Sequence, residues 1–300
     1  MSKLLDIVNA PWALEPAKLE QLVAIYCGHL RGEKVDLQAI EAQLGRPLAN
    51  EPQTYEIVDG VAILPMEGML AKRMNLFSKV SGGTSTELLG RELRKAQEDP
   101  RVHAMILAID SPGGQVDGTQ ALADQVFGLR ASGKPVVALA DGAMTSGAYW
   151  IGSAAAEIYI AGDTVITGSI GVATQHVDVS RNNEKWGITV TDIYAGKYKR
   201  IASENKPLSE EGRAHIQALV DKMYGVFVDQ VARHRGTEAD TVLKNMAEGR
   251  LFVGREAIAA GLVDGVSTLD QLIADLVAGR KPAKRTNAKA SAPAAGAAAA

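Results

Sequence analysis

The residues that could do chemistry gather in two glycine-rich loops, each directly after an apolar run of strand length. The run "MILAID" is followed by "SPGG" (residues 111–114), and the run "PVVALA" is followed by "DGAMTSGAYW" (141–150), where small side chains surround Ser146. In a parallel α/β sheet, ligands bind at the carboxyl ends of the strands, so both loops are expected at one site. Ser146 is the candidate reactive group of that site.

Two roles are open to Ser146. A serine at the start of a helix is commonly a structural N-cap, whose side-chain oxygen accepts a backbone N–H bond. It could instead be a nucleophile, because backbone amides at a helix start favour negative charge and the Gly147 amide, with those of Gly113 and Gly114, could hold an oxyanion. The small residues around Ser146 would then leave room for a peptide backbone.

A serine nucleophile needs a base, and the candidates follow it in the sequence. His176 could act as a base with little change of its pKa, since the ordinary pKa of histidine is near neutrality. The lysines must lose a proton, which requires burial or like charges to lower the pKa by ~3 units. These lysines are Lys197, Lys199 and Lys206. The pattern of residues leaves the choice open, and each group has the alternative of being a solvated charge or a hydrogen-bonded loop histidine.

The elements that would position these loops alternate between strand and helix. Apolar runs at 103–110, 135–141 and 157–162, and again at 168–173 and 187–196, are separated by helical segments at 119–131 and 145–155. This alternation predicts right-handed βαβ units and a mostly parallel sheet.

Outside this alternation the sequence predicts a hairpin and a series of helices. The hairpin turns at Asp59-Gly60, and a helix begins at a capping box formed by Thr84 and Glu87 and ends before Pro100. A long helix with an apolar stripe is expected at 209–234. Further helices are expected within 15–47 and at 238–247, 254–261 and 268–278.

Composition narrows the function. The 300 residues are 46% hydrophobic with a net charge of −3, which predicts a globular protein and no nucleic-acid partner. No apolar run is long enough for a membrane span, so a cytoplasmic protein is expected. The single cysteine, Cys27, is expected to be a packed thiol. No metal-ligand spacing or phosphate loop occurs, so neither a metal nor another cofactor is expected.

Five blocks in a fixed order resemble the S49 serine peptidases, the signal peptide peptidase A family. They span about residues 56–270 and read "DSPGG", "DGAMTSGAYWIGSAA", "TGSIGV", "GKYKRIASENKPLSEEGR" and "AEGRLFVGREAIAAGLVDGV". The resemblance implies a ClpP/crotonase-like α/β spiral and a Ser-Lys dyad, with Ser146 as the nucleophile and Lys199 as the base. It also implies an oxyanion hole formed by Gly113 or Gly114 together with Gly147.

The N-terminal stretch "NAPWALEPAKLEQL" resembles the head maturation proteases of lambda-like tailed phages. That resemblance implies a protease that cleaves phage scaffold or capsid proteins in the host cytoplasm or the prohead. A homo-oligomer is expected because the dyad enzymes that the chain resembles tend to assemble into rings. The expected organisation is an N-terminal helical appendage (1–50), a peptidase domain (51–278) and an Ala-rich disordered tail (279–300).

Three alternatives remain at this point. A ClpP-like triad would use Ser146, His176 and Asp178. A crotonase-like enzyme acting on acyl-CoA would share the oxyanion hole and need no Ser-Lys pair. A capsid assembly module would keep the fold without catalysis.

Overall fold

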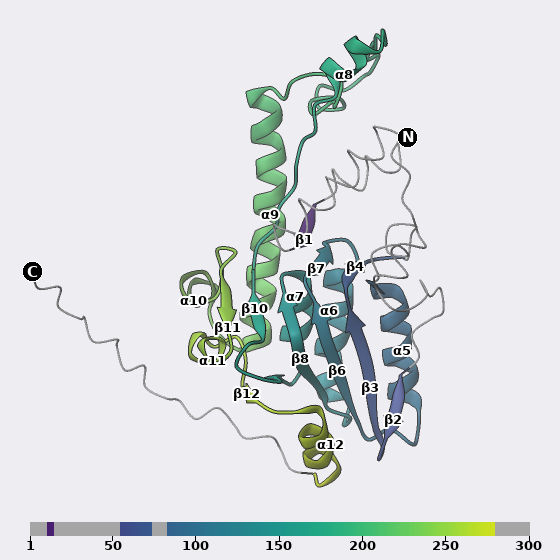
Figure 1. Cartoon of the computed structure of the whole chain (residues 1–300), viewed down its shortest axis with the longest axis vertical. Helices are drawn as coiled ribbons and strands as arrows, with labels where there is room; N and C mark the ends of the chain where they lie inside the picture. The colour runs from purple at the N-terminus through teal and green to yellow at the C-terminus, as the bar shows by residue number, and fades with distance from the viewer. Residues whose placement is uncertain (1–10, 15–54, 74–82, 280–300) are drawn as a thin grey trace, which may run out of the picture.

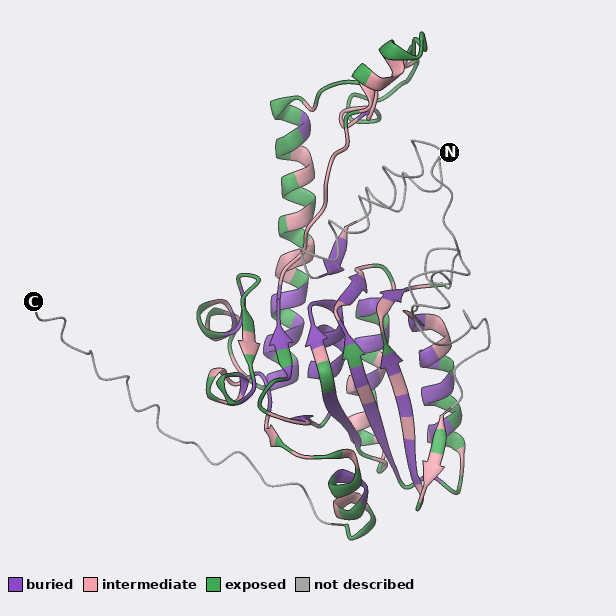
Figure 2. Ribbon diagram, viewed as in Figure 1, coloured by how far each residue is buried: buried purple, intermediate pink, exposed green. Residues whose placement is uncertain are grey.

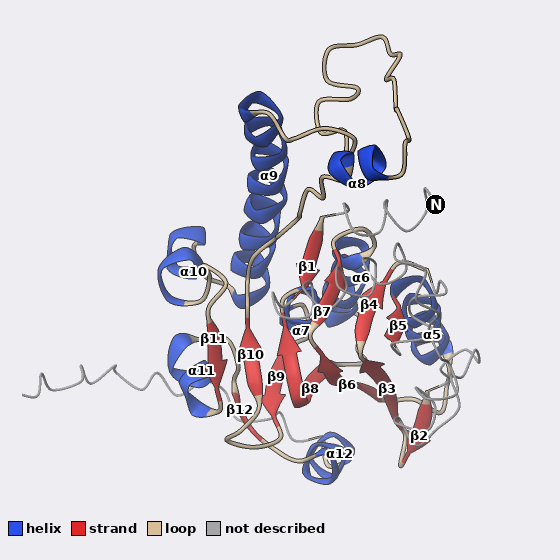
Figure 3. Cartoon of the chain, turned by 45° about the horizontal axis from the view of Figure 1, so that its top comes forward, coloured by secondary structure: helices blue, strands red, loops and turns tan. Residues whose placement is uncertain are grey.

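The main sheet of the computed structural model carries the expected parallel core. The structure describes residues 11–14, 55–73 and 83–279. Its larger sheet has the strand order β11-β10-β8-β6-β3-β2, with β9 and β12 attached beside β8 (Figures 1 and 3). The strands are β2 (Glu56–Val58), β3 (Val61–Glu67), β6 (Ala104–Ser111), β8 (Val136–Thr145), β9 (Glu157–Ile160), β10 (Ile166–Gly168), β11 (Leu251–Val253) and β12 (Gly265–Val266). The neighbours β3, β6, β8 and β10 are parallel, which confirms the α/β class.

The two faces of this sheet are covered by different helices. Alternate residues of a strand point to opposite faces, so Leu107 and Ile109 of β6 join one core cluster while Ile106 joins the other. The first cluster includes residues of α5 (Thr86–Glu98), α6 (Thr119–Gly128) and α7 (Gly147–Ser153). The second is covered by α12 (Leu269–Val277). Because both faces are covered, residues 104–109 of β6 and 136–140 of β8 are continuously apolar.

A second, smaller sheet forms where the chain leaves the main strands. It has the order β1-β7-β4-β5, and its strands are β1 (Trp12–Leu14), β4 (Met69–Ala71), β5 (Gly83–Ser85) and β7 (Gly113–Gln115). The chain passes from β3 into β4 through Gly68 and from β6 into β7 through Pro112. The carboxyl ends of the central strands therefore face the small sheet, and the site lies between the two.

The long helix α9 (Glu210–Arg235) is anchored by its second half only. Phe227 stacks on Trp150 of α7 with ring centres 4.3 Å apart and an 8° angle between the planes. The short helices α10 (Ala239–Asn245) and α11 (Arg255–Ala260) lie beside this half. The first half of α9 extends beyond the sheet, together with residues 174–209, which we call the arm and which include α8 (Ser180–Lys185) (Figure 1).

Most of the expected elements are present. The hairpin turns at Asp59 and Gly60, both with positive φ (49° and 83°). The helices expected at 119–131, 145–155 and 209–234 are found, the first ending in the 3₁₀ turn Leu129–Ala131, as are the three short C-terminal helices. The helices expected within 15–47, Cys27 among them, lie outside the described residues, as does the tail beyond 279.

Three expectations need correction. The segment 187–196 forms no strand: it lies in the arm, where Ile193 is 95% exposed, because no sheet edge is available there for pairing. Of the run 168–173 only Gly168 belongs to a strand. The helix α5 is capped by Ser85, whose hydroxyl accepts the Leu88 N–H, whereas Thr84 belongs to β5.

Residues 12–14 form a strand, whereas the sequence predicts only helices for the N-terminal region. Among the described residues, none of the helices combines the length and the apolar character that crossing a bilayer requires.

Candidate active site

Ser146 stands at the sharp turn between β8 and α7. Its backbone has φ 55° and ψ −123°, a combination that residues with a side chain rarely adopt. Two hydrogen bonds fix it there: the Ser146 N–H donates to the Gly168 carbonyl at the end of β10 (2.8 Å), and the Trp150 N–H donates to the Ser146 carbonyl (2.9 Å). A non-glycine residue held in such a region costs about 1–3 kcal/mol, so the surrounding structure must impose it.

The hydroxyl of Ser146 does not cap the helix. No backbone N–H of α7 bonds to it, so the structural N-cap role is wrong for this serine. The residue is 1% exposed, and among the described residues its Oγ has no hydrogen-bond partner. An unpaired buried hydroxyl costs about 1–3 kcal/mol more. Strain and an unpaired hydroxyl at one residue are characteristic of a reactive group rather than of a packing residue.

Gly113 and Gly147 bring the two glycine-rich loops into contact. A methyl group on Gly113 would lie 2.8 Å from the Gly147 nitrogen and 2.9 Å from the Ser146 Cβ, both closer than side chains tolerate. Gly113 also has φ 96°, so the position favours glycine on two grounds. A methyl on Gly114 would collide with the backbone of Leu70. The sequence-predicted residues Ser146, Gly113, Gly114 and Gly147 therefore lie together.

The amides beside Ser146 are not equally available. The Gly113 N–H donates to Ser111 Oγ (3.2 Å), whose own hydroxyl donates to the Gly68 carbonyl (2.6 Å). Gly147 is the first residue of α7, and the first N–H groups of a helix have no acceptor within it. A methyl on Gly147 would lie 3.4 Å from the Gly114 nitrogen. The amides of Gly147 and Gly114 thus flank one position beside the serine.

Lys199 is not brought to Ser146 within the chain. It is exposed in the arm, where its neighbour Lys197 pairs with Glu211 (2.5 Å) at the start of α9. Among the described residues Ser146 Oγ has no hydrogen-bond partner, so the amine and the hydroxyl do not meet within one copy. Lys206 is likewise exposed in the arm. The hydrogen bond that Lys197 donates to Glu211 raises the pKa of Lys197, which is the wrong direction for a base.

The alternative base has a different partner. His176 is half-buried, and its Nε2 lies 3.1 Å from the Ser203 carbonyl oxygen, within the arm. Asp178 is exposed and accepts the Ser180 N–H (2.9 Å), and hydrogen bonds from Ser180 are the main reason that its pKa is lowered. Within the chain the triad is therefore not assembled, and His176 is a hydrogen-bonded loop histidine.

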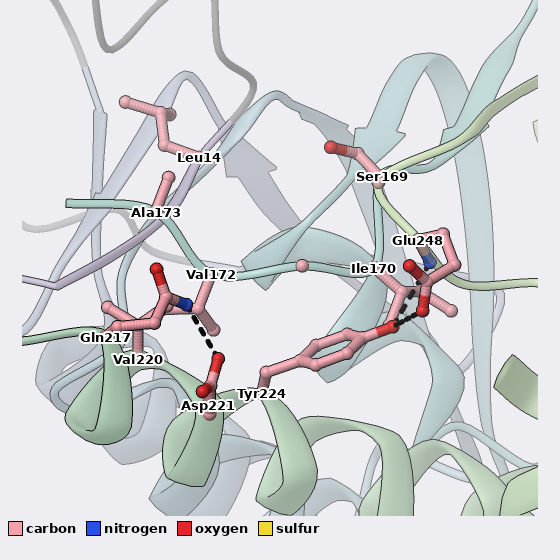
Figure 4. A pocket seen from close by; sticks show the side chains of 12 residues that line it. Leu14, Ser169, Ile170, Val172, Ala173, Gln217, Val220, Asp221, Tyr224 and Glu248 are labelled. Carbon is pink, nitrogen blue, oxygen red and sulfur yellow. Dashed lines mark hydrogen bonds between the residues drawn. The ribbon is translucent and has the colours of Figure 1, made fainter. Parts of the chain in front are cut away.

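A pocket adjoins the site on the side of α9. It is lined by Leu14 of β1, by Ser169 and Ala173 after β10, and by Gln217 and Tyr224 of α9 (Figure 4). Tyr224 donates to Glu248 (2.8 Å), and Gln217 donates to Asp221 (2.7 Å), so these polar side chains are held in place. Nowhere in the described ranges do three or more His, Cys, Asp or Glu side chains cluster as a metal site would require.

Ser146 is strained, its hydroxyl has no partner among the described residues, and the Gly147 amide opens a helix beside it. This arrangement at a strand-to-helix turn defines the class of serine hydrolases that work through an oxyanion hole. The model of peptidase family S49 matches residues 128–281, and the chain belongs to this family.

Similar proteins include viral and plant proteases. Capsid assembly protease C of Escherichia phage lambda is 31% identical over 269 residues, which are 85% of this chain and 60% of that protein. Head-tail preconnector protein GP5 of Enterobacteria phage P21 is 34% identical over 212 residues, 71% of this chain and 42% of that protein. The chloroplastic serine protease SPPA of Arabidopsis thaliana is 30% identical over 217 residues, 72% and 32% of the two chains. The chain thus spans about two fifths to three fifths of the length of the two phage relatives.

Proposed function

We propose that this chain is a serine endopeptidase in which Ser146 attacks the peptide carbonyl and Lys199 is the general base. The observation that carries the proposal is the state of Ser146: a buried hydroxyl without a partner in the described structure, on a backbone with φ 55°, next to the Gly147 amide. Membership of peptidase family S49 supports the same reaction.

The reaction would proceed through an acyl-enzyme. Ser146 Oγ forms a bond to the carbonyl carbon while its proton passes to the base; the C–N bond then breaks, and the base returns the proton to the leaving amine. Water hydrolyses the ester in a second, equivalent step. The amide of Gly147, with that of Gly114 or Gly113, would stabilise the oxyanion, and a donor of this kind contributes about 2.7–4 kcal/mol to the transition state.

We propose that the dyad is completed between two copies of the chain. Within one copy Lys199 is exposed in the arm and Ser146 Oγ has no partner among the described residues, so the two side chains do not meet without a rearrangement of the arm. In Figure 2 most of the arm is coloured as exposed or intermediate. The arm exposes large apolar side chains, among them Trp186 (52%), Tyr198 (51%) and Ile193 (95%), which are typical of a surface that another protein covers. Covering this surface would also remove water from around Lys199, and the loss of hydration disfavours the charged form of an amine.

The proposed substrates are phage scaffold or capsid proteins, processed in the host cytoplasm or the prohead. The support comes from the relatives, one of which is a capsid assembly protease. A homo-oligomer is part of this proposal.

Mixing two inactive variants tests the shared dyad. Ser146→Ala and Lys199→Ala should each abolish cleavage of a denatured protein substrate, while Lys206→Ala, which removes another exposed lysine of the arm, should retain it. If each site takes its serine and lysine from different copies of a closed ring, equimolar mixing after subunit exchange should restore on the order of a quarter of the activity. Full activity in either single variant refutes the dyad. A mixture that exchanges subunits but stays inactive refutes the shared site.

His176→Ala provides the comparison with the triad. The dyad predicts near-normal activity for this variant, because His176 contacts the Ser203 carbonyl within the arm. Loss of activity in His176→Ala together with its retention in Lys199→Ala would favour the triad.

A further inference from the structure

The strand β1 lies across the candidate active site, bonded through its main chain on both edges. On one edge it pairs antiparallel with β7, with Ala13 opposite Gly114 and Leu14 opposite Gly113, and the Val116 N–H donates to the Pro11 carbonyl (3.3 Å). On the other edge, Trp12 and Ala173 exchange two N–H to carbonyl bonds of 2.9 Å each. An extended segment held between two strands in this way is how proteins bind peptides by strand addition.

The carbonyl oxygen of Ala13 lies at the corner between the serine and the amides. A methyl group on Gly113 would collide with this oxygen, and the same methyl would lie 2.8 Å from the Gly147 nitrogen and 2.9 Å from the Ser146 Cβ. A methyl on Gly147 would lie 3.1 Å from the Ala13 oxygen and 3.4 Å from the Gly114 nitrogen. The Ala13 carbonyl therefore lies beside Ser146 and the Gly147 amide, the two groups that a scissile carbonyl must contact.

The side chains on either side of this carbonyl are enclosed. Trp12, Ala13 and Leu14 are all buried, and Ala13 belongs to the main core cluster. Leu14 lines the pocket formed with Ser169, Ala173 and α9 (Figure 4). The site thus accommodates a methyl side chain before the bond and a leucine after it.

We propose that Pro11–Leu14 is a substrate segment built into the chain and that the Ser146 site cleaves the Ala13–Leu14 peptide bond. This inference rests on the proposed peptidase function and adds its substrate preference: an extended segment with a small residue before the scissile bond. Ser146 Oγ forms an ester with the Ala13 carbonyl carbon, the bond to the Leu14 nitrogen breaks, and that nitrogen takes the proton which the serine gave to the base. Water then hydrolyses the ester, releasing residues 1–13 and regenerating the hydroxyl.

The intact mass of the purified full chain tests the proposal. The active protein should lose residues 1–13 and begin at Leu14, whereas Ser146→Ala should keep them. The Ala13→Phe chain should remain uncut, because a phenyl ring does not fit the buried position of a methyl group. This variant should still cleave an added peptide that displaces residues 11–14 from the site.

A synthetic peptide removes any dependence on the folding of variants. The peptide of residues 6–19, DIVNAPWALEPAKL, should be cut between its Ala-Leu pair in a Ser146-dependent reaction, and the same peptide carrying Ala13→Phe should be cut at least tenfold more slowly. If Ser146 cleaves a denatured protein but the Ala13–Leu14 bond stays intact in both the chain and the peptide, the inference is overturned and the peptidase function stands. Failure to cleave any of the three substrates would overturn both.

Discussion

The strain and the unpaired hydroxyl at Ser146 predict that removing this serine makes the protein more stable. Alanine removes only the hydroxyl, whose burial without a partner costs about 1–3 kcal/mol. Glycine removes the hydroxyl and also relieves the backbone strain at φ 55°, which stabilises the folded state by about 1–3 kcal/mol more. The greater freedom of glycine in the unfolded chain offsets about 0.5–1 kcal/mol of this gain. We therefore expect Ser146→Gly to have the highest free energy of unfolding, Ser146→Ala an intermediate one and the wild type the lowest.

Urea unfolding at a fixed protein concentration measures this order. The comparison of the two variants is direct, because neither can cleave itself. Ser153 supplies the matched control: it is also a buried serine near α7, but its hydroxyl bonds to the Trp150 carbonyl (2.8 Å) and to His234 Nδ1 (2.9 Å). Ser153→Ala, made in the Ser146→Ala background, should therefore lose about 1–3 kcal/mol. If Ser146→Gly were less stable than Ser146→Ala, the strain argument would be wrong.

Three further predictions concern the anchor of α9, the buried histidine and the contact between loops. Phe227→Ala should lower the free energy of unfolding by about 3–5 kcal/mol, since it empties a buried stack on Trp150. Leu219→Ala, at a residue of α9 that is 44% exposed, should change it by less than ~0.5 kcal/mol in the same urea assay. Burial lowers the pKa of His234 to about 3, and the nearby arginines add to the effect. Between about pH 6.5 and pH 3 this histidine therefore binds a proton only in the unfolded chain. The free energy of unfolding should fall by up to ~1.4 kcal/mol per pH unit over that range. His234→Gln should flatten that slope, and an unchanged slope would contradict the assignment. Gly113→Ala should reduce kcat/KM at least ~100-fold, because its methyl would displace Ser146 and the Gly147 amide; a variant with normal kinetics would show that the loops need not touch.

Much of the fold follows from local pattern. The strands β6 and β8 are apolar runs of the right length, each followed by a glycine-rich loop and a helix, and these features depend only on residues adjacent in sequence. The position of Ser146 at the end of β8 follows from the same pattern. The contact of Gly113 with Gly147 was expected because neighbouring parallel strands place their carboxyl ends at one edge.

The tertiary structure decided what local pattern could not. The run 187–196 has strand-like composition, yet it forms no strand because whether a segment pairs depends on a free sheet edge nearby. The distance between Lys199 and Ser146 depends on the direction of α9, which is set by the stack of Phe227 on Trp150. The strand β1 is three residues long and carries no periodic signal; it exists because the main chains of β7 and Ala173 lie on either side of it. Sequence determined the chemical groups and the elements that carry them, and contacts between residues remote in the chain determined which of those groups meet.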